Sequence, residues 1–184
     1  MLIERLFSSG VMQMGPSRND PNRQVGVFNP EAVAGVPALR AARMDEFRWI
    51  AGEWNYENAV PATAVNPAYS DAGACKYAIC EKNNWVCMVA PDGKETPQIT
   101  FDAFSKQWIY VLMSGAYGML RSAEGWNNDQ IVFTGLMTMI GLNCEWRIRW
   151  TKENADRFSF VNEELDGNGS WAYIDEWRFT RKSG

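Results

Sequence analysis

Ten short segments with the character of β-strands follow one another from residue 53 to the end of the chain. They are rich in aromatic and β-branched residues, and Gly-, Asn- and Asp-containing breaks separate them, as in strands joined by tight turns. The segments are residues 53–60, 73–80, 85–90, 97–104, 107–113, 116–124, 130–135, 137–150 (broken near Gly141), 157–165 and 170–180. This many strands without a second helical pattern predict an antiparallel barrel or sandwich.

Two different segments precede the strands. Residues 38–50 carry apolar residues at helical spacing among charged ones, which predicts a short helix that Gly52 ends. Residues 1–37 contain four prolines and no sustained period, so we expect an irregular N-terminal arm. The expected organisation is therefore an arm over 1–37 and one barrel domain over 38–184.

The last three predicted strands separate an aromatic face from a charged face. Side chains alternate between the two faces of a strand, so a register can be judged by the faces it produces. The preferred register pairs Trp150 with Phe158, Phe158 with Trp177, Trp146 with Asn162 and Tyr173, and Cys144 with Glu164 and Trp171. The opposite face then carries Glu145, Arg147, Arg149, Ser159, Glu163, Glu176 and Arg178. We expect the aromatic face to lie inside.

Composition excludes several classes of function. The chain contains no His, which removes His-ligated zinc, proximal-His haem and every Ser–His or Cys–His catalytic pair. Its net charge is −4 and its basic residues are dispersed, so no basic stripe is available to neutralise the phosphates of a nucleic acid. We therefore expect no metal, no cofactor and no nucleic-acid partner.

The cysteines and the hydropathy pattern bear on the compartment. No two of Cys75, Cys80, Cys87 and Cys144 form a C-x-x-C motif, and a chain with this much core does not require disulfides. We expect four free thiols, with Cys80 and Cys87 as the pair best placed to contradict this. No apolar run reaches the roughly 18 residues of a membrane-spanning helix. We expect a cytoplasmic protein, with a secreted or periplasmic location as the alternative.

Gly52-Glu53-Trp54, directly after the predicted helix, resembles the G-x-W signature of lipocalins and of the wider calycin barrels. In that group the Trp closes one end of the barrel and a basic residue of the last strand packs over it. The resemblance implies that role for Trp54, and Arg178 and Arg181 are placed to supply the basic residue.

A longer resemblance covers about residues 45–182. The segments ITFDAFSKQWIYV, GWNNDQIVFTG and WRIRWTKENADRFSFVNEELDGNGSWAYIDEWRFTRK are similar to uncharacterised bacterial calycin-like families. Nitrobindin-type members of the wider group bind haem through a His, which this chain lacks. With the strand pattern, the resemblance implies an all-β, up-and-down calycin-like barrel of about 8–10 strands with one short N-terminal helix.

The predicted inner face divides into a packed end and a polar end. Trp54, Trp150, Phe158, Trp177 and Phe179 are expected to fill the closed end, and Met113, Met119, Met137 and Met139 are expected in the core. Toward the other end, carboxylates and an amide lie among aromatic rings, the combination that orients a ligand in an apolar cavity. The candidate ligand-binding residues are Trp146, Asn162, Glu164, Trp171, Tyr173 and Asp175.

These features support three functions. The leading hypothesis is binding or carriage of an apolar or aromatic small molecule, without catalysis. The alternative is a lipocalin-like isomerase, cyclase or decarboxylase, which needs a Tyr hydroxyl and an inward carboxylate in one cavity. The third is a homo-oligomeric interaction module, such as a homodimer, which needs a filled barrel with an exposed apolar patch.

Overall fold

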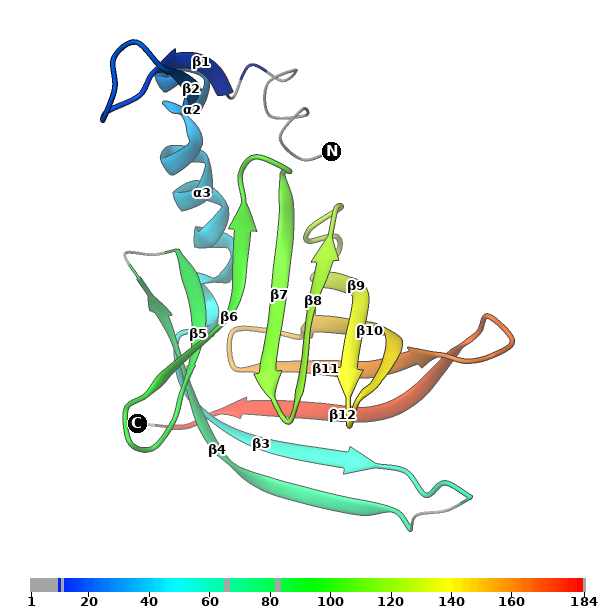
Figure 1. Ribbon diagram of the computed structural model, residues 1–184. Helices are drawn as coiled ribbons and strands as arrows, with labels where there is room; N and C mark the ends of the chain where they lie inside the picture. Colours follow the sequence, from blue (N-terminus) through cyan, green and yellow to red (C-terminus); the bar gives the residue numbers. More distant parts are fainter. Residues whose placement is uncertain (1–9, 11, 65–66, 82–83, 184) are drawn as a thin grey trace.

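The computed structural model describes residues 10, 12–64, 67–81 and 84–183. Ten antiparallel strands close into one barrel, in which each strand pairs with its neighbours along the chain and the last pairs with the first (Figure 1). The strands are β3 (Gly52–Val60), β4 (Tyr69–Cys80), β5 (Trp85–Val89), β6 (Glu95–Asp102), β7 (Gln107–Ser114), β8 (Ala116–Ser122), β9 (Gln130–Met139), β10 (Leu142–Lys152), β11 (Arg157–Leu165) and β12 (Trp171–Arg181). The all-β barrel fold expected from the sequence is confirmed.

One strand boundary differs clearly from the prediction. β9 runs without a break from Gln130 to Met139, where the sequence predicted two separate strands divided at residue 136. The break expected near Gly141 is present as the Ile140–Gly141 turn between β9 and β10. Both turn residues have positive φ, 44° and 80°, as two-residue hairpin turns require. A β-branched residue rarely adopts this conformation, so Gly141 is the residue of the turn that the sequence reveals.

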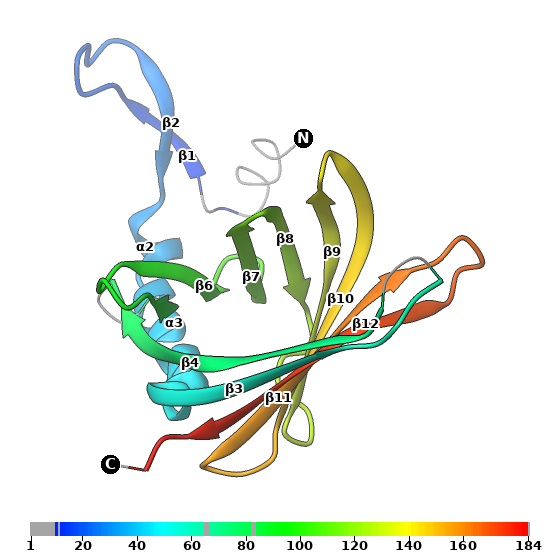
Figure 2. The ribbon, with the colours of Figure 1, turned by 90° about the horizontal axis from the view of Figure 1, so that it is seen from below.

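The arm is more regular than expected. Its described residues contain a hairpin of β1 (Met12–Pro16) and β2 (Gln24–Phe28), followed by α2 (Pro30–Val33). The hairpin lies at the far end of the helical segment from the barrel (Figures 1 and 2). The expectation of an irregular arm is wrong because its prolines occupy tolerated positions: Pro16 ends a strand, and Pro30 begins a helix.

The helical segment before the barrel plugs one end of it. α3 (Val36–Met44) continues into a 3₁₀-helix, η1 (Asp45–Ile50), and Phe47 and Ile50 of η1 are fully buried in the core. The Trp54 indole, at the start of β3, is also fully buried and donates a hydrogen bond to the carbonyl oxygen of Ile50 at 2.8 Å. This is the closed end of the barrel.

Aromatic rings fill the closed end largely as predicted. Trp54, Trp150, Phe158 and Phe179 are buried, whereas Trp177 is only half-buried, farther along the barrel. Arg181, one of the two arginines expected there, covers Trp54, with its Cζ 4.2 Å from the ring centroid.

Two expectations about sulfur-containing residues are wrong. Cys80 and Cys87 form a disulfide between β4 and β5, with Cα atoms 6.1 Å apart, and only Cys75 and Cys144 are free. Because β4 and β5 pair across a short hairpin, Cys80 and Cys87 are close enough for their sulfur atoms to form a disulfide.

Met137 is buried, but Met113, Met119 and Met139 are exposed. Met113 and Met119 fall on the outward face of β7 and β8, and Met139 ends β9 beside the turn to β10.

Candidate ligand-binding mouth

The end of the barrel opposite η1 leaves inward-facing side chains accessible. Leu142 shares the inward face of β10 with Trp146 and Trp150, yet it is 68% exposed. On neighbouring strands, Met139 is exposed and Phe160 is half-buried. The closed end is packed, whereas apolar surface inside this open end faces solvent.

The wall of the barrel is incomplete beside these residues. β12 pairs with β3 only over Glu176–Arg181, so β3 pairs with none of Trp171–Asp175. Within this stretch Trp171, Ala172, Tyr173 and Asp175 pair with β11, and Ile174 does not. The hairpins β3–β4 and β11–β12 project from the barrel in the same direction (Figures 1 and 2). The inner face of the β11–β12 hairpin is therefore reachable at the open end.

Five side chains, Asn58, Trp146, Asn162, Asp175 and Trp177, form a hydrogen-bonded group that we call the mouth cluster. Asn162 donates from Nδ2 to Oδ1 of Asp175 at 2.7 Å and accepts from Trp146 Nε1 at 3.3 Å. The Trp177 indole donates to Oδ2 of Asp175 at 3.4 Å, and the Asn58 amide also bonds to this carboxylate. The cluster places one carboxylate among neutral donors and two indole rings.

Asp175 is the electrostatically unusual member of the cluster. Partial burial raises the pKa of its carboxyl, and the hydrogen bonds from Asn162, Trp177 and Asn58 offset only part of that increase. All three partners are neutral, and within the described residues no Lys or Arg forms an ion pair with Asp175. Its negative charge is thus solvated by dipoles without a counter-cation.

A second polar pair lies on the inward face of the β3–β4 hairpin. The Tyr56 hydroxyl lies 3.4 Å from Oδ2 of Asp71, and Asp71 is opposite Asn58 in the register. Burial, followed by the nearby Asp71 carboxylate, raises the pKa of Tyr56. The sequence interpretation missed Tyr56 and Asn58, although they follow Trp54 at intervals of two and therefore share its face.

The structure brings together three of the six predicted site residues: Trp146, Asn162 and Asp175. Glu164 lies on the same inward face as Trp146, to which it pairs, but it is exposed at the rim. The predicted pairing of β10 with β11 is shifted by two residues: Trp150 lies opposite Phe160, not Phe158. A shift of two keeps every side chain on its face.

Trp171 and Tyr173 instead face outward. A bulge in β12 interrupts the ladder between Asn162–Asp175 and Glu163–Tyr173, and the extra residue, Ile174, reverses the alternation beyond it. The expectation that all six residues share the inner face is therefore wrong for these two. Trp171 packs against Arg147 instead, with the Arg147 Cζ 4.5 Å from the ring centroid.

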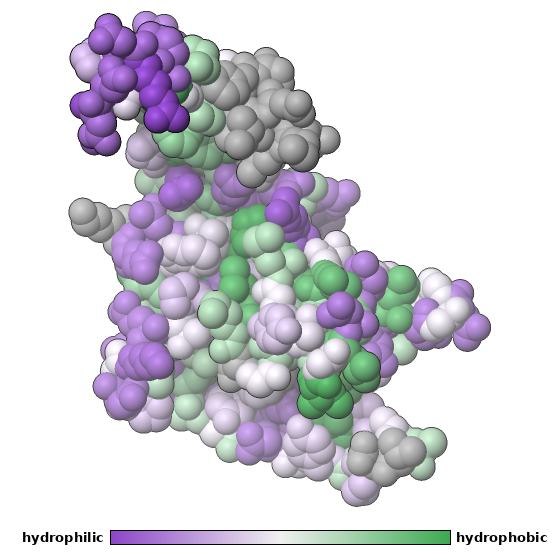
Figure 3. All heavy atoms as spheres, in the orientation of Figure 1, coloured by the Kyte–Doolittle hydropathy of each residue, from purple (hydrophilic) through white to green (hydrophobic). Residues whose placement is uncertain are grey.

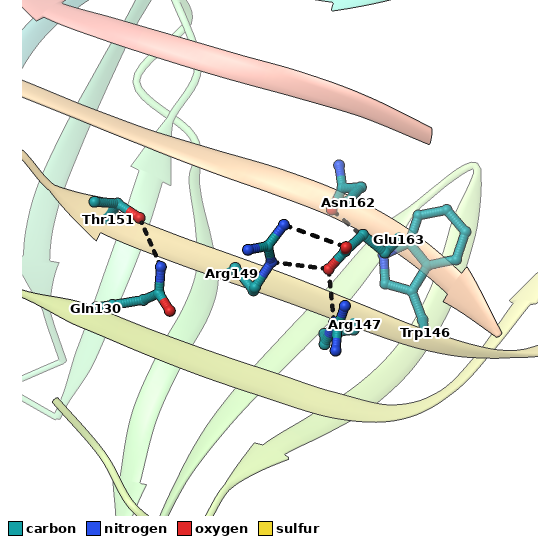
Figure 4. A network of polar contacts seen from close by, with 7 residues as sticks. All are labelled: Gln130, Trp146, Arg147, Arg149, Thr151, Asn162 and Glu163. Carbon is teal, nitrogen blue, oxygen red and sulfur yellow. Dashed lines mark hydrogen bonds and ion pairs between the residues drawn. The ribbon is translucent and has the colours of Figure 1, made fainter. Parts of the chain in front are cut away.

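Arg147 belongs to an ion-pair network on the outer face (Figure 4). The buried Glu163 carboxylate accepts from Nε of Arg147 at 2.6 Å and from Nε of Arg149 at 2.9 Å. Burial by itself would raise the pKa of Glu163, but these hydrogen bonds and charges outweigh it and hold the pKa below its usual value. The charged outer face predicted for β10 and β11 is present, and it is separate from the mouth cluster.

Among the described residues, one group of metal-ligating residue types lies close together. The sulfur atoms of Cys80 and Cys87 and a carboxylate oxygen of Glu95 lie within 4.8 Å of one another. Because the two sulfurs are bonded to each other, they offer no thiolate ligand. Across the described residues, no helix is both long and apolar enough to span a lipid bilayer.

Comparison with known proteins gives similar structures but no family. No family model matches the chain, and no curated protein matches it. Rv2717c from M. tuberculosis is similar in structure, with a TM-score of 0.49 and 10% identity over 78% of this chain and 99% of that one.

A protein of unknown function from the DUF3598 family of Nostoc punctiforme aligns with a TM-score of 0.38 and 10% identity, over 73% of this chain and 48% of that one. EF1p2_mFAP2b, in a structure bound to DFHBI, aligns with a TM-score of 0.36 and 12% identity, over 78% of this chain and 98% of that one.

Proposed function

We propose that the protein binds an apolar or aromatic small molecule in the open end of its barrel. The observation that carries the proposal is the exposure of inward-facing apolar side chains there, above all Leu142. Covering apolar surface contributes about 25 cal/mol per Å² removed from water, so an apolar guest stabilises this arrangement. The mouth cluster supplies the few polar groups that orient a bound ligand.

We infer further that the chain is a lipocalin-like, calycin-type barrel related to uncharacterised bacterial families. The contact of Arg181 with Trp54 at the closed end supports this inference, because it is the arrangement that the G-x-W resemblance implies. The Cys80–Cys87 disulfide supports a secreted or periplasmic location over a cytoplasmic one, since disulfides persist in oxidising compartments.

A matched pair of leucines tests the binding site. Leu142 faces inward at the mouth and Leu136 faces outward on β9, where it is 50% exposed. An apolar fluorescent probe that quenches Trp emission should bind the wild-type protein saturably. Leu142→Asp should weaken binding about tenfold or more, because it places a charge against the apolar guest, whereas Leu136→Asp should leave it unchanged. Equal effects of the two variants, or the absence of saturable binding, would contradict the proposal.

The enzymatic alternative receives less support. The Tyr–carboxylate pair that it requires is present as Tyr56 and Asp71. Because the pKa of Tyr56 is raised, its hydroxyl is a weaker acid than an ordinary phenol, which opposes proton donation near neutral pH. Binding requires no such proton transfer.

Self-association is a second candidate function, and the exposed side chains favour it. Met113, Tyr117, Met119, Leu136 and Ile140 form what we call the outer apolar patch, over β7, β8, β9 and the turn after β9. In the register Met113 lies opposite Tyr117, and Met119 lies opposite Leu136, so the members are neighbours on one face. Figure 3 shows apolar surface gathered near the β9–β10 turn. Contiguous exposed apolar surface of this kind is typical of interaction sites.

A further inference from the structure

We propose that the ligand is an organic cation, whose protonated amine pairs with Asp175 while its apolar part lies against the rings of the mouth. This inference rests on the proposed binding function and names the chemical class of the ligand.

The first argument is the incomplete electrostatic environment of Asp175. Its carboxylate accepts hydrogen bonds from two amides and one indole, at 2.7 Å for Asn162 and 3.4 Å for Trp177. A carboxylate has about four acceptor positions and is most favourably solvated by charged donors. Neutral donors fix its orientation without neutralising it, so an ammonium group at the mouth would supply the missing positive charge.

The second argument is the set of rings around this carboxylate. The Trp177 ring stacks against the Phe160 ring with centroids 5.8 Å apart, and its centroid lies 5.2 Å from the centroid of the Tyr56 ring. Trp146 belongs to the same group through the hydrogen bond that its indole donates to Asn162. A cation within about 6 Å of an aromatic face is attracted by the electrons of the ring, and Trp is the best partner. Aromatic rings beside a carboxylate therefore favour a ligand with a protonated amine over a neutral ligand.

The third argument is the sign of the charge around the mouth. Three acids, Asp71, Glu164 and Asp175, lie on the inward face of their strands near the open end. In β3, β10, β11 and β12, the described inward positions carry basic residues only at the closed end, where Lys152 contacts Trp49 and Arg181 contacts Trp54. The mouth is thus negative, and it attracts cations and disfavours anions.

Three probes with the same ring distinguish the charge classes: naphthylethylamine, naphthylethanol and naphthylpropionate. Titration calorimetry at pH 7 should show the amine binding at least tenfold more tightly than the alcohol, and the carboxylate binding most weakly. Equal affinities for amine and alcohol would overturn the cation preference and leave the proposed function intact. Failure of all three probes to bind would overturn the proposed function itself.

Charge-neutralising variants then test the assignment to Asp175. Asp175→Asn should reduce the amine-to-alcohol preference to about twofold or less while the alcohol still binds. Glu145→Gln, which removes the same charge from the outward face of β10, should keep the full preference. Glu164→Gln, at the exposed rim, should lower the preference about two- to threefold without affecting folding. An Asp175→Asn protein that retains the preference would overturn the assignment, as would an equal loss in Glu145→Gln.

Discussion

Arg181 shows how single residues close one end of this barrel. Its Nη2 donates to the carbonyl of Trp49 at 2.6 Å and its Nη1 to that of Ala51 at 3.1 Å, while the guanidinium covers the Trp54 ring. Gly52 has φ of +134°, and a Cβ there would lie 2.6 Å from Nη1 of Arg181. The positive φ of Gly52 is the feature that favours glycine in the G-x-W pattern, and the Arg181 guanidinium occupies the space beside it while it covers the Trp54 ring.

Trp54 and Trp171 provide a residue-scale prediction, because one lies fully buried and the other on the outer face. Trp54→Ala should lower the free energy of unfolding by roughly 3–5 kcal/mol, the cost of deleting a buried aromatic side chain. Trp171→Ala should cost about 1 kcal/mol, since it loses mainly a half-buried cation–π contact with Arg147 on the outer face. Urea unfolding monitored by far-UV circular dichroism measures both. Similar losses in the two variants would mean that Trp171 is a core residue.

At the scale of the elements, the pairing of β10 with β11 carries a pH-dependent contribution. The folded-state pKa of Glu163 lies below its usual value, so its ion pairs stabilise the protein above the unfolded-state pKa and are lost as pH falls through the folded-state pKa. Glu163→Gln should lower the free energy of unfolding by about 1.5–3 kcal/mol at pH 7. The difference from wild type should shrink as pH falls through the lowered folded-state pKa, where the wild-type carboxyl takes up its proton.

Urea titrations between pH 3 and pH 7 measure this difference. Glu176→Gln is the control, because its ion pair with Arg178 is exposed and surface pairs contribute about 0–1 kcal/mol. A constant difference between wild type and Glu163→Gln at all pH values would show that the loss arises from packing, not from charge.

The elements also show which features the sequence could reveal. Alternation identified the inner face of β10 and β11 correctly even though the pairing was wrong by two residues, because a shift of two leaves each side chain on its face. The bulge at Ile174 was not predictable: it adds one residue to β12 and leaves no compositional mark, and it turned Trp171 and Tyr173 outward.

For the whole molecule, the open end and the outer apolar patch are two surfaces on opposite sides of one wall. Leu142 faces into the barrel from β10, and Leu136 faces out of it from the adjacent strand. In the two proposals, a ligand would bind at the first surface and a second copy of the chain would cover the second. The two candidate functions are therefore compatible, and they are separable because no side chain serves both.

Sedimentation velocity should show a wild-type dimer at about 100 μM protein, a concentration at which association with a Kd of about 1–10 μM is nearly complete. Leu136→Asp should make the protein monomeric, because the interface would bury two unpaired carboxylates at a cost of several kcal/mol. Leu142→Asp should leave the dimer intact while weakening probe binding. Thr134→Asp, on the same outward face of β9 but outside the patch, controls for the added charge. A wild-type protein that stays monomeric at this concentration would contradict the proposed self-association. The exposed Met113 and Leu136 would then not be covered by a second copy of the chain.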